Sequence, residues 1–263
     1  MARNQRPREG NVTKLGSTPR SAVTVTNTRD FFSVRSEYWT MVTELAEGVW
    51  WFDLRGVNAY LFEDSEGVTL VDAGAPWTRG ALLDQLDDAG FRPRDVTRIA
   101  LTHYDLDHVG ALGRFEAERP VYAGEPDADI LRGDRRLPWN NRKTAFQRAT
   151  GLVVSEPAQS IETVGDGDRI GDLTVYETPG HTAGHLAFVS EARSVAFVGD
   201  LVRESDGRLE PSPWALSQDT DAVDSSIRRL AGLDLDVEVL AMGHGTPFRK
   251  RGATYLDDLA GRL

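Results

Sequence analysis

Short apolar runs separated by turn residues recur along the chain from about residue 41. Residues 49–52, 59–62 and 68–71 are typical of β-strands joined by tight turns. Later apolar runs, several of them next to glycine, predict buried strands of the same kind. These further strands are expected at residues 99–101, 121–122, 173–176, 186–189, 195–198 and 237–241.

Apolar positions three and four residues apart predict the helices. A helix is expected from Thr78, as its N-cap, to about Ala89, with Leu82 and Leu86 on one face and Gly90 as its stop. The same spacing predicts helices at about residues 109–118, 221–231 and 253–262. Early hairpins followed by alternating strands and helices do not fit a simple doubly wound sheet. The pattern instead favours an α/β fold, a four-layer αββα sandwich of two mixed β-sheets between outer helices.

The first 40 residues differ from the rest in charge and patterning. They hold seven basic and three acidic residues, a balance of +4 in a chain of net charge −11. Little apolar periodicity precedes Phe31. This composition predicts a disordered N-terminal extension, or alternatively a true start at Met41. Residues 41–263 are expected to form a single domain with a polar insert at about 125–150.

The overall charge restricts the partners. A net charge of −11 repels phosphates, so we expect no nucleic acid as partner. No apolar run approaches the roughly 20 residues that span a bilayer, so we expect no membrane partner and a cytoplasmic location. Only three of the 30 basic residues are lysine, which fits either adaptation to high salt or a GC-rich genome. The sequence leaves the oligomeric state open.

All five histidines lie in three short motifs, each of which follows an apolar run. The motifs are Thr-His-Tyr-Asp-Leu-Asp-His at 102–108, Pro-Gly-His-Thr-Ala-Gly-His at 179–185 and Gly-His-Gly at 243–245. Asp200 ends a fourth apolar run. Imidazole and carboxylate groups at strand ends are ligands for divalent metals, whereas the absence of cysteine excludes a thiolate site. The motifs therefore predict one metal centre.

These motifs, in this order, resemble the metallo-β-lactamase-fold hydrolases over about residues 44–250. The family signature is His-x-His-x-Asp-His, then Gly-His-x-x-Gly-His, then a strand-terminal Gly-Asp and a late Gly-His. The resemblance implies two divalent metal ions, with zinc favoured and manganese or iron as alternatives. It implies His103, Asp105 and His181 as ligands of the first ion, Asp107, His108 and His244 as ligands of the second, and Asp200 as the bridge.

One position departs from the family pattern, because Asp105 stands where the signature has its second histidine. A carboxylate there can bind the first metal, or it can form a hydrogen bond to an imidazole. His185 is expected to be a packed, hydrogen-bonded support of the site, and Asp72 a structural carboxylate beside it.

The resemblance implies hydrolysis by a metal-bound, bridging hydroxide, with Asp107 orienting the nucleophile or taking its proton. The expected substrate is a small ester, thioester or related small molecule. The alternatives are a mononuclear iron oxygenase of the same fold and a metal-poor binding protein. The insert at 125–150 has six basic and four acidic residues, so it would either receive an anionic substrate or be ordinary solvated surface. Trp139 and Phe146 would form an apolar lid there, and Trp214 would line the pocket or pack its loop.

Overall fold

The computed structural model describes residues 42–137, 143–145 and 157–263. The described residues belong to one compact unit, Thr40–Leu263. The predictions for residues 1–40, Trp139 and Phe146 lie outside the described residues.

The N-terminal half of the described chain forms a mixed seven-stranded sheet. Its strands follow the order β1-β2-β3-β4-β5-β6-β7. Strands β1 to β4 pair antiparallel, whereas β4 to β7 pair parallel. The strands are β1 (Thr43–Ala46), β2 (Val49–Asp53), β3 (Asn58–Asp64), β4 (Gly67–Val71), β5 (Arg98–Ala100), β6 (Val121–Ala123) and β7 (Ile161–Thr163).

The C-terminal half forms a second mixed sheet, of order β14-β11-β10-β9-β8. Only β11 and β14 pair parallel in it. Its strands are β8 (Arg169–Ile170), β9 (Leu173–Glu177), β10 (Leu186–Ser190), β11 (Val195–Gly199) and β14 (Val239–Met242), and a separate hairpin joins β12 (Val202–Ser205) to β13 (Arg208–Pro211). The prediction of two mixed sheets is confirmed.

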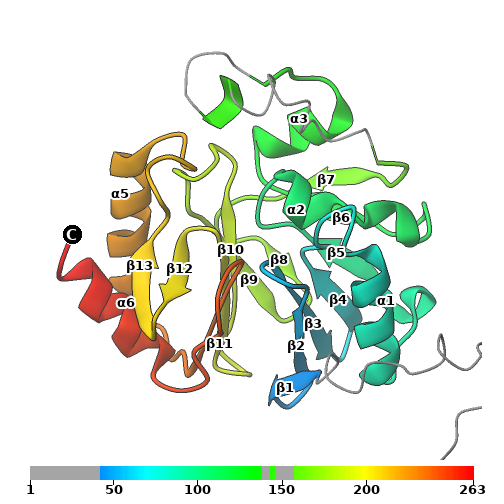
Figure 1. Ribbon diagram of the computed structural model, residues 1–263, viewed down its shortest axis with the longest axis horizontal. Helices are drawn as coiled ribbons and strands as arrows, with labels where there is room; N and C mark the ends of the chain where they lie inside the picture. The colour runs from blue at the N-terminus through cyan, green and yellow to red at the C-terminus, as the bar shows by residue number, and fades with distance from the viewer. Residues whose placement is uncertain (1–41, 138–142, 146–156) are drawn as a thin grey trace, which may run out of the picture. The chain divides into compact units, whose positions relative to one another are not determined.

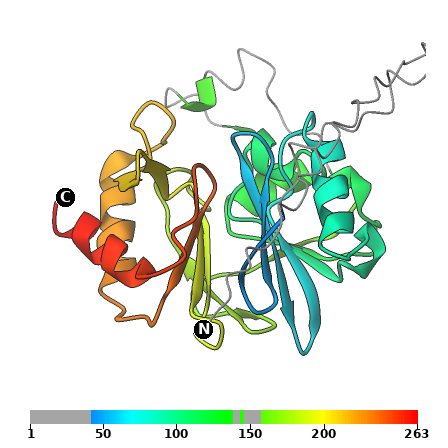
Figure 2. The same cartoon turned by 60° about the horizontal axis from the view of Figure 1, so that its bottom comes forward.

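Helices cover the outer faces of both sheets, which gives the expected αββα order of layers (Figures 1 and 2). Alternate residues of one strand serve different layers: Leu61 of β3 packs in the core that contains Leu82 and Leu86, whereas Phe62 packs between the sheets with Phe197. A third core lies between the second sheet and the C-terminal helices. The helices are α1 (Arg79–Asp88), α2 (Leu106–Val109), α3 (Asp127–Arg132), α5 (Thr220–Ala231) and α6 (Gly252–Ala260), with 3₁₀ turns at Pro93–Asp95 and Leu112–Arg114.

The predicted helix at 109–118 is wrong. Helix α2 ends at Val109, and only a 3₁₀ turn follows at Leu112–Arg114. The chain turns because Gly110 packs against the backbone after β4: a Cβ on Gly110 would lie 2.2 Å from the nitrogen of Pro76. The Gly110 amide also donates to the carbonyl of Gly74 at 2.7 Å. This close docking fixes the loop that carries the first histidine motif. Across the described residues, no helix has the length and apolarity needed to cross a membrane.

Candidate metal centre

The strand directions bring the three motifs and Asp200 to one edge of the sheets. Strands β11 and β14 run parallel, so Asp200 and His244, which follow them, emerge at the same end. Strand β10 runs antiparallel to β11, so the loop before it, with His181, reaches that edge as well. The amide of Leu186 donates to the carbonyl of Thr102 at 2.8 Å, which ties this loop to the His103 motif of the other sheet.

Asp72 fixes the ring orientation of two histidines. Its Oδ2 accepts hydrogen bonds from the Thr102 hydroxyl and from Nδ1 of His108, both at 2.8 Å. Because the Thr102 hydroxyl donates to Asp72, it accepts from Nδ1 of His103, which lies 2.9 Å away. Both rings therefore use Nδ1 for support and turn Nε2 towards the centre of the site. Asp72 thus occupies the supporting position expected for it.

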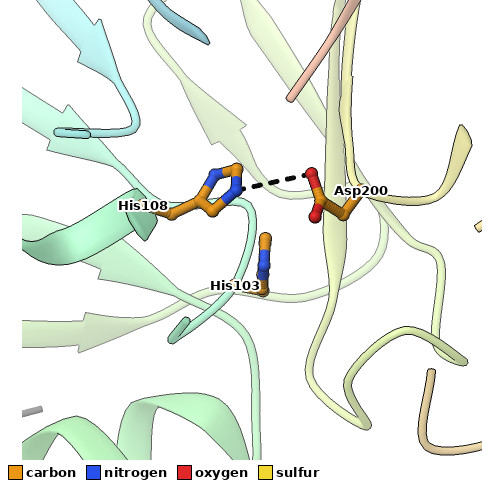
Figure 3. Close-up of side chains that lie close together, drawn as sticks. All are labelled: His103, His108 and Asp200. Atoms are coloured by element: carbon orange, nitrogen blue, oxygen red, sulfur yellow. Dashed lines mark ion pairs between the residues drawn. The ribbon is translucent and has the colours of Figure 1, made fainter. Parts of the chain in front are cut away.

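Three buried atoms meet at this centre without a hydrogen-bond partner among the described residues. They are Nε2 of His103, Nε2 of His108 and Oδ1 of Asp200 (Figure 3). The ligand atoms of these three side chains all lie within 4.8 Å of one another, and His108 Nε2 is 3.4 Å from Asp200 Oδ1. Four ligands at about 2.1 Å from a tetrahedral ion lie about 3.4 Å apart. Because buried polar atoms without a hydrogen bond are unfavourable, the donor set fits a divalent cation.

The approach of the strand ends depends on Gly243. A Cβ at this position would lie 2.0 Å from Asp200 Oδ1 and 2.7 Å from Cε1 of His108. Only a residue without a side chain lets the end of β14 come this close. This steric requirement explains why a glycine precedes His244 in the third motif.

Asp200 lies between the two ligand groups predicted for separate metals. Its Oδ2 is 3.1 Å from Nε2 of His244 and 3.5 Å from Nε2 of His181, while Oδ1 faces His108. Its amide donates to Nε2 of His185 at 3.1 Å, so that ring supports the loop, as expected. Burial raises the pKa of Asp200, but His244 and His108 outweigh it and hold the pKa well below its usual range. Asp200 therefore contacts histidines of both predicted ligand groups.

The group predicted for the second metal comes together at the more open side. Oδ2 of Asp107 lies 3.6 Å from Nε2 of His244 and 4.0 Å from Nε2 of His108. Nδ1 of His244 bonds the carbonyl of Gly56, which leaves Nε2 facing the site. Asp200 raises the pKa of His244 to about 9. Burial lowers the pKa of His108, but Asp200 and Asp72 raise it, and the result is well above the usual value. The neighbouring carboxylates therefore favour a positive charge at the rings of His244 and His108, which either a bound proton or a bound metal ion can supply.

The group predicted for the first metal also comes together, but it includes a lysine. Oδ2 of Asp105 lies 3.1 Å from Nε2 of His181 and 3.4 Å from Nε2 of His103. Nζ of Lys143 lies 2.8 Å from the same Oδ2 and 2.7 Å from His181 Nε2. Burial raises the pKa of Asp105, but Lys143 and His103 bring it well below the usual range. Burial and Lys143 lower the pKa of His181 to about 3.

Sequence reasoning missed Lys143 as a site residue and counted it among the basic residues of the insert. The structure shows a buried lysine whose ammonium group points into the histidine cluster. Arg132, another residue of that insert, is neutralised by Asp129 and Glu125, each at 2.7 Å. Trp214 is 65% exposed, so most of its side chain faces solvent. The expectation that the insert receives an anionic substrate gains no support from Arg132.

Comparison with known proteins agrees with this geometry. The family model of the metallo-beta-lactamase superfamily matches residues 52–244. Metallo-beta-lactamase domain-containing protein 1 of Homo sapiens is 35% identical over 197 residues, which is 74% of this chain and 64% of that protein. The probable metallo-hydrolase YflN of Bacillus subtilis is 25% identical over 84% of this chain and 92% of its own length.

Two solved structures show the same architecture. A metallo-beta-lactamase family protein of Thermus thermophilus, TTHA1429, superposes with a TM-score of 0.63 at 27% identity, covering 83% of this chain and 80% of that one. The protein TTHA1623, solved in a di-iron-bound form, superposes with a TM-score of 0.56 at 30% identity, covering 73% of this chain and 88% of that one. The predicted αββα architecture is confirmed by these neighbours.

Proposed function

Since the chain belongs to the metallo-beta-lactamase superfamily, we propose that it is a metal-dependent hydrolase acting on a small ester, thioester or related small molecule. One observation carries the proposal: Nε2 of His103, Nε2 of His108 and Oδ1 of Asp200 converge at the edge of the two sheets, buried and without a hydrogen bond among the described residues. A relative named a probable metallo-hydrolase supports the reaction class. A net charge of −11 disfavours nucleic acid as the substrate.

We propose His103, His108 and Asp200 as metal ligands, with His244 and Asp107 completing the set. Zinc is the first choice for the metal, and manganese or iron are alternatives. Iron gains support from the di-iron-bound relative. Bound divalent ions supply a Lewis acid for the substrate oxygen and lower the pKa of water, so that hydroxide forms at neutral pH.

Residues around the proposed metal centre orient the attacking water and the histidine ligands. Asp107 has the most exposed carboxylate among the proposed ligands, with 37% of its side chain accessible, so it can contact an incoming water molecule. We assign it to orient this water and to accept its proton. Asp72 and the Gly56 carbonyl hold the rings of His108 and His244 so that Nε2 stays directed at the centre.

The test combines metal content with hydrolysis. The protein is purified without added metal or chelator, its metals are measured by elemental analysis, and p-nitrophenyl esters, thioesters, lactones and phosphodiesters are screened before and after chelation. Asp107→Asn is expected to lower kcat about 10²–10⁴-fold, the usual contribution of an acid–base group. Asp84→Asn, on the exposed face of α1, is the matched control and should leave kcat unchanged. Bound metal without chelation-sensitive hydrolysis of any substrate would contradict the proposal.

A second function is favoured by one specific feature. His103, His108 and Asp200 make up two histidines and one carboxylate, the ligand types that non-haem iron oxygenases use. An oxygenase centre has no need for the additional imidazole of His244 and carboxylate of Asp107, which is why hydrolysis is preferred. Oxygen consumption by the iron-loaded protein, without hydrolysis, would reverse this preference.

A further inference from the structure

Lys143 occupies the place where the first metal ion was expected. Its side chain is 5% exposed, and its Nζ lies 2.8 Å from Asp105 Oδ2, 2.7 Å from His181 Nε2 and 3.1 Å from the His181 carbonyl oxygen. An ammonium group has three N–H donors, and these three acceptors use all of them. The lysine is therefore held as a fixed cation and has no donor left for a substrate.

The hydrogen bonds of His181 make this arrangement incompatible with a metal ion on the same nitrogen. Nδ1 of His181 lies 2.8 Å from the Ser212 hydroxyl. Nε2 faces the ammonium of Lys143, which can only donate, so Nε2 is the acceptor and Nδ1 carries the proton. A neutral imidazole has a single acceptor lone pair. The lone pair of His181 can bind Lys143 or a metal ion, but not both.

The carboxylate of Asp105 stabilises the buried charge of Lys143. A histidine at this position, as in the family signature, would leave the buried ammonium without a carboxylate in direct contact, which is strongly unfavourable. The carboxylate of Asp105 supplies this contact at 2.8 Å. The replacement of histidine by aspartate and the buried lysine therefore form one compensated pair.

We propose that Lys143 permanently fills the first metal position, so that the protein binds one divalent ion per chain at the centre of His103, His108 and Asp200, with His244 and Asp107 completing the ligand set, next to a built-in ammonium cation. The ligand atoms of His103, His108 and Asp200 are buried and make no hydrogen bond to another described residue. This inference rests on the proposed metal centre and defines its stoichiometry. Lys143 acts as a positioning residue, because it orients Asp105 and His181 and touches no substrate.

Metal counting tests the inference directly. Wild type, Lys143→Met and Lys250→Met are stripped with chelator, reconstituted with excess zinc or cobalt, and desalted. Elemental analysis and native mass spectrometry then give the number of ions per chain. We expect about one ion in wild type, about two in Lys143→Met, and about one in the control Lys250→Met, whose side chain is exposed. Titration with cobalt, followed by its visible absorbance, gives an independent end-point.

A second variant covers the case in which Lys143→Met fails to fold because Asp105 loses its partner. The double variant Lys143→Met/Asp105→His restores the family's neutral histidine and is expected to bind about two ions. Two ions in wild type would overturn the inference while leaving the metal-dependent function intact. One ion in every folded variant would also overturn it, because Lys143 would then not be the competitor. No ion in any protein would refute the proposed metal centre itself.

Discussion

Replacing Asp72 with asparagine tests how a carboxylate that binds no metal sets the affinity of the centre. Asp72 is 2% exposed, and its Oδ2 accepts from the Thr102 hydroxyl and from His108 Nδ1. The Thr102 amide donates to the other oxygen, Oδ1, at 2.9 Å. An asparagine that keeps its oxygen towards this amide presents its NH₂ group to the Thr102 hydroxyl and His108 Nδ1. The clash is relieved when His108 loses its Nδ1 proton and keeps a proton on Nε2. That tautomer has no lone pair on Nε2 for the metal.

The expected loss of affinity follows from this tautomer change. Removing the partner of a metal-ligating histidine lowers metal affinity about 10–100-fold. At 1.4 kcal/mol for each tenfold change, this is about 1.4–2.8 kcal/mol. In the metal-free protein, the loss of one hydrogen bond to a charged group costs about 1.5–3 kcal/mol. For a domain of this size, that corresponds to a fall in Tm of roughly 3–12 °C.

The assay pairs two buried carboxylates. Asp127 is fully buried and accepts from the Thr182 hydroxyl at 2.6 Å and from the Gly184 amide at 2.9 Å, but no bond described for it joins it to an imidazole. Asp127→Asn should therefore lower Tm by a similar amount with little change in metal affinity. Zinc Kd is measured for both variants and wild type by competition with a chromogenic chelator, and apo-protein Tm by calorimetry.

The comparison of the two variants decides the outcome. The reasoning is refuted if Asp72→Asn unfolds at the lower temperature but keeps the wild-type zinc Kd. It is also refuted if Asp127→Asn loses as much affinity as Asp72→Asn, since general loosening of the loops would then explain both results.

Three further predictions concern pH, a tautomer and salt. Burial raises the pKa of Asp127 to about 6, above its unfolded value of about 3.9, so the folded state binds more protons between these values. Apo-protein stability should therefore fall as pH rises, by about 3 kcal/mol in all between about pH 3 and pH 7, relative to Asp127→Asn in urea titrations. Ser212→Ala leaves Nδ1 of His181 without its hydrogen-bond acceptor and should lower the free energy of unfolding by about 1–3 kcal/mol. The control Ser225→Ala, on the exposed side of α5, should lower it by under about 0.5 kcal/mol, and equal losses would contradict the role of Ser212. If the charge of −11 reflects adaptation to high salt, Tm should rise between about 0.1 and 3 M KCl, and a falling Tm would exclude it.

The architecture could be predicted because buried strands carry a strong signal. Residues 186–189 and 195–198 are apolar at every position, and the structure uses both of their faces: Phe188 packs between the sheets, whereas Ala187 packs against the C-terminal helices. The expected helix at 109–118 failed for a reason that local periodicity does not contain. Gly110 must approach the backbone of Pro76, 34 positions earlier, and this long-range contact overrides the helical spacing of the apolar residues.

The predicted ligand positions came together because strand-end motifs in this fold share one edge. The sequence did not reveal which charged residues of the insert are buried. Asp127 and Lys143 look like surface charges in a polar stretch, yet Asp127 holds Thr182 and Gly184 beside the site, and Lys143 enters it. Composition alone does not distinguish such residues from solvated ones, because these partners lie at least 38 positions away along the chain.

Asp105 was expected either to bind a metal or to form a hydrogen bond to an imidazole, and its contact with His181 combines features of both. Its Oδ2 lies 3.1 Å from His181 Nε2, which is the spacing of a hydrogen bond. However, Nε2 carries a lone pair when Lys143 donates to it, so two acceptors face each other and only a cation between them makes the contact favourable. The ammonium of Lys143 bonds both atoms, at 2.8 Å and 2.7 Å, as a metal ion would join two ligands. Asp105 is therefore arranged as a ligand, with an ammonium group as the cation that it binds.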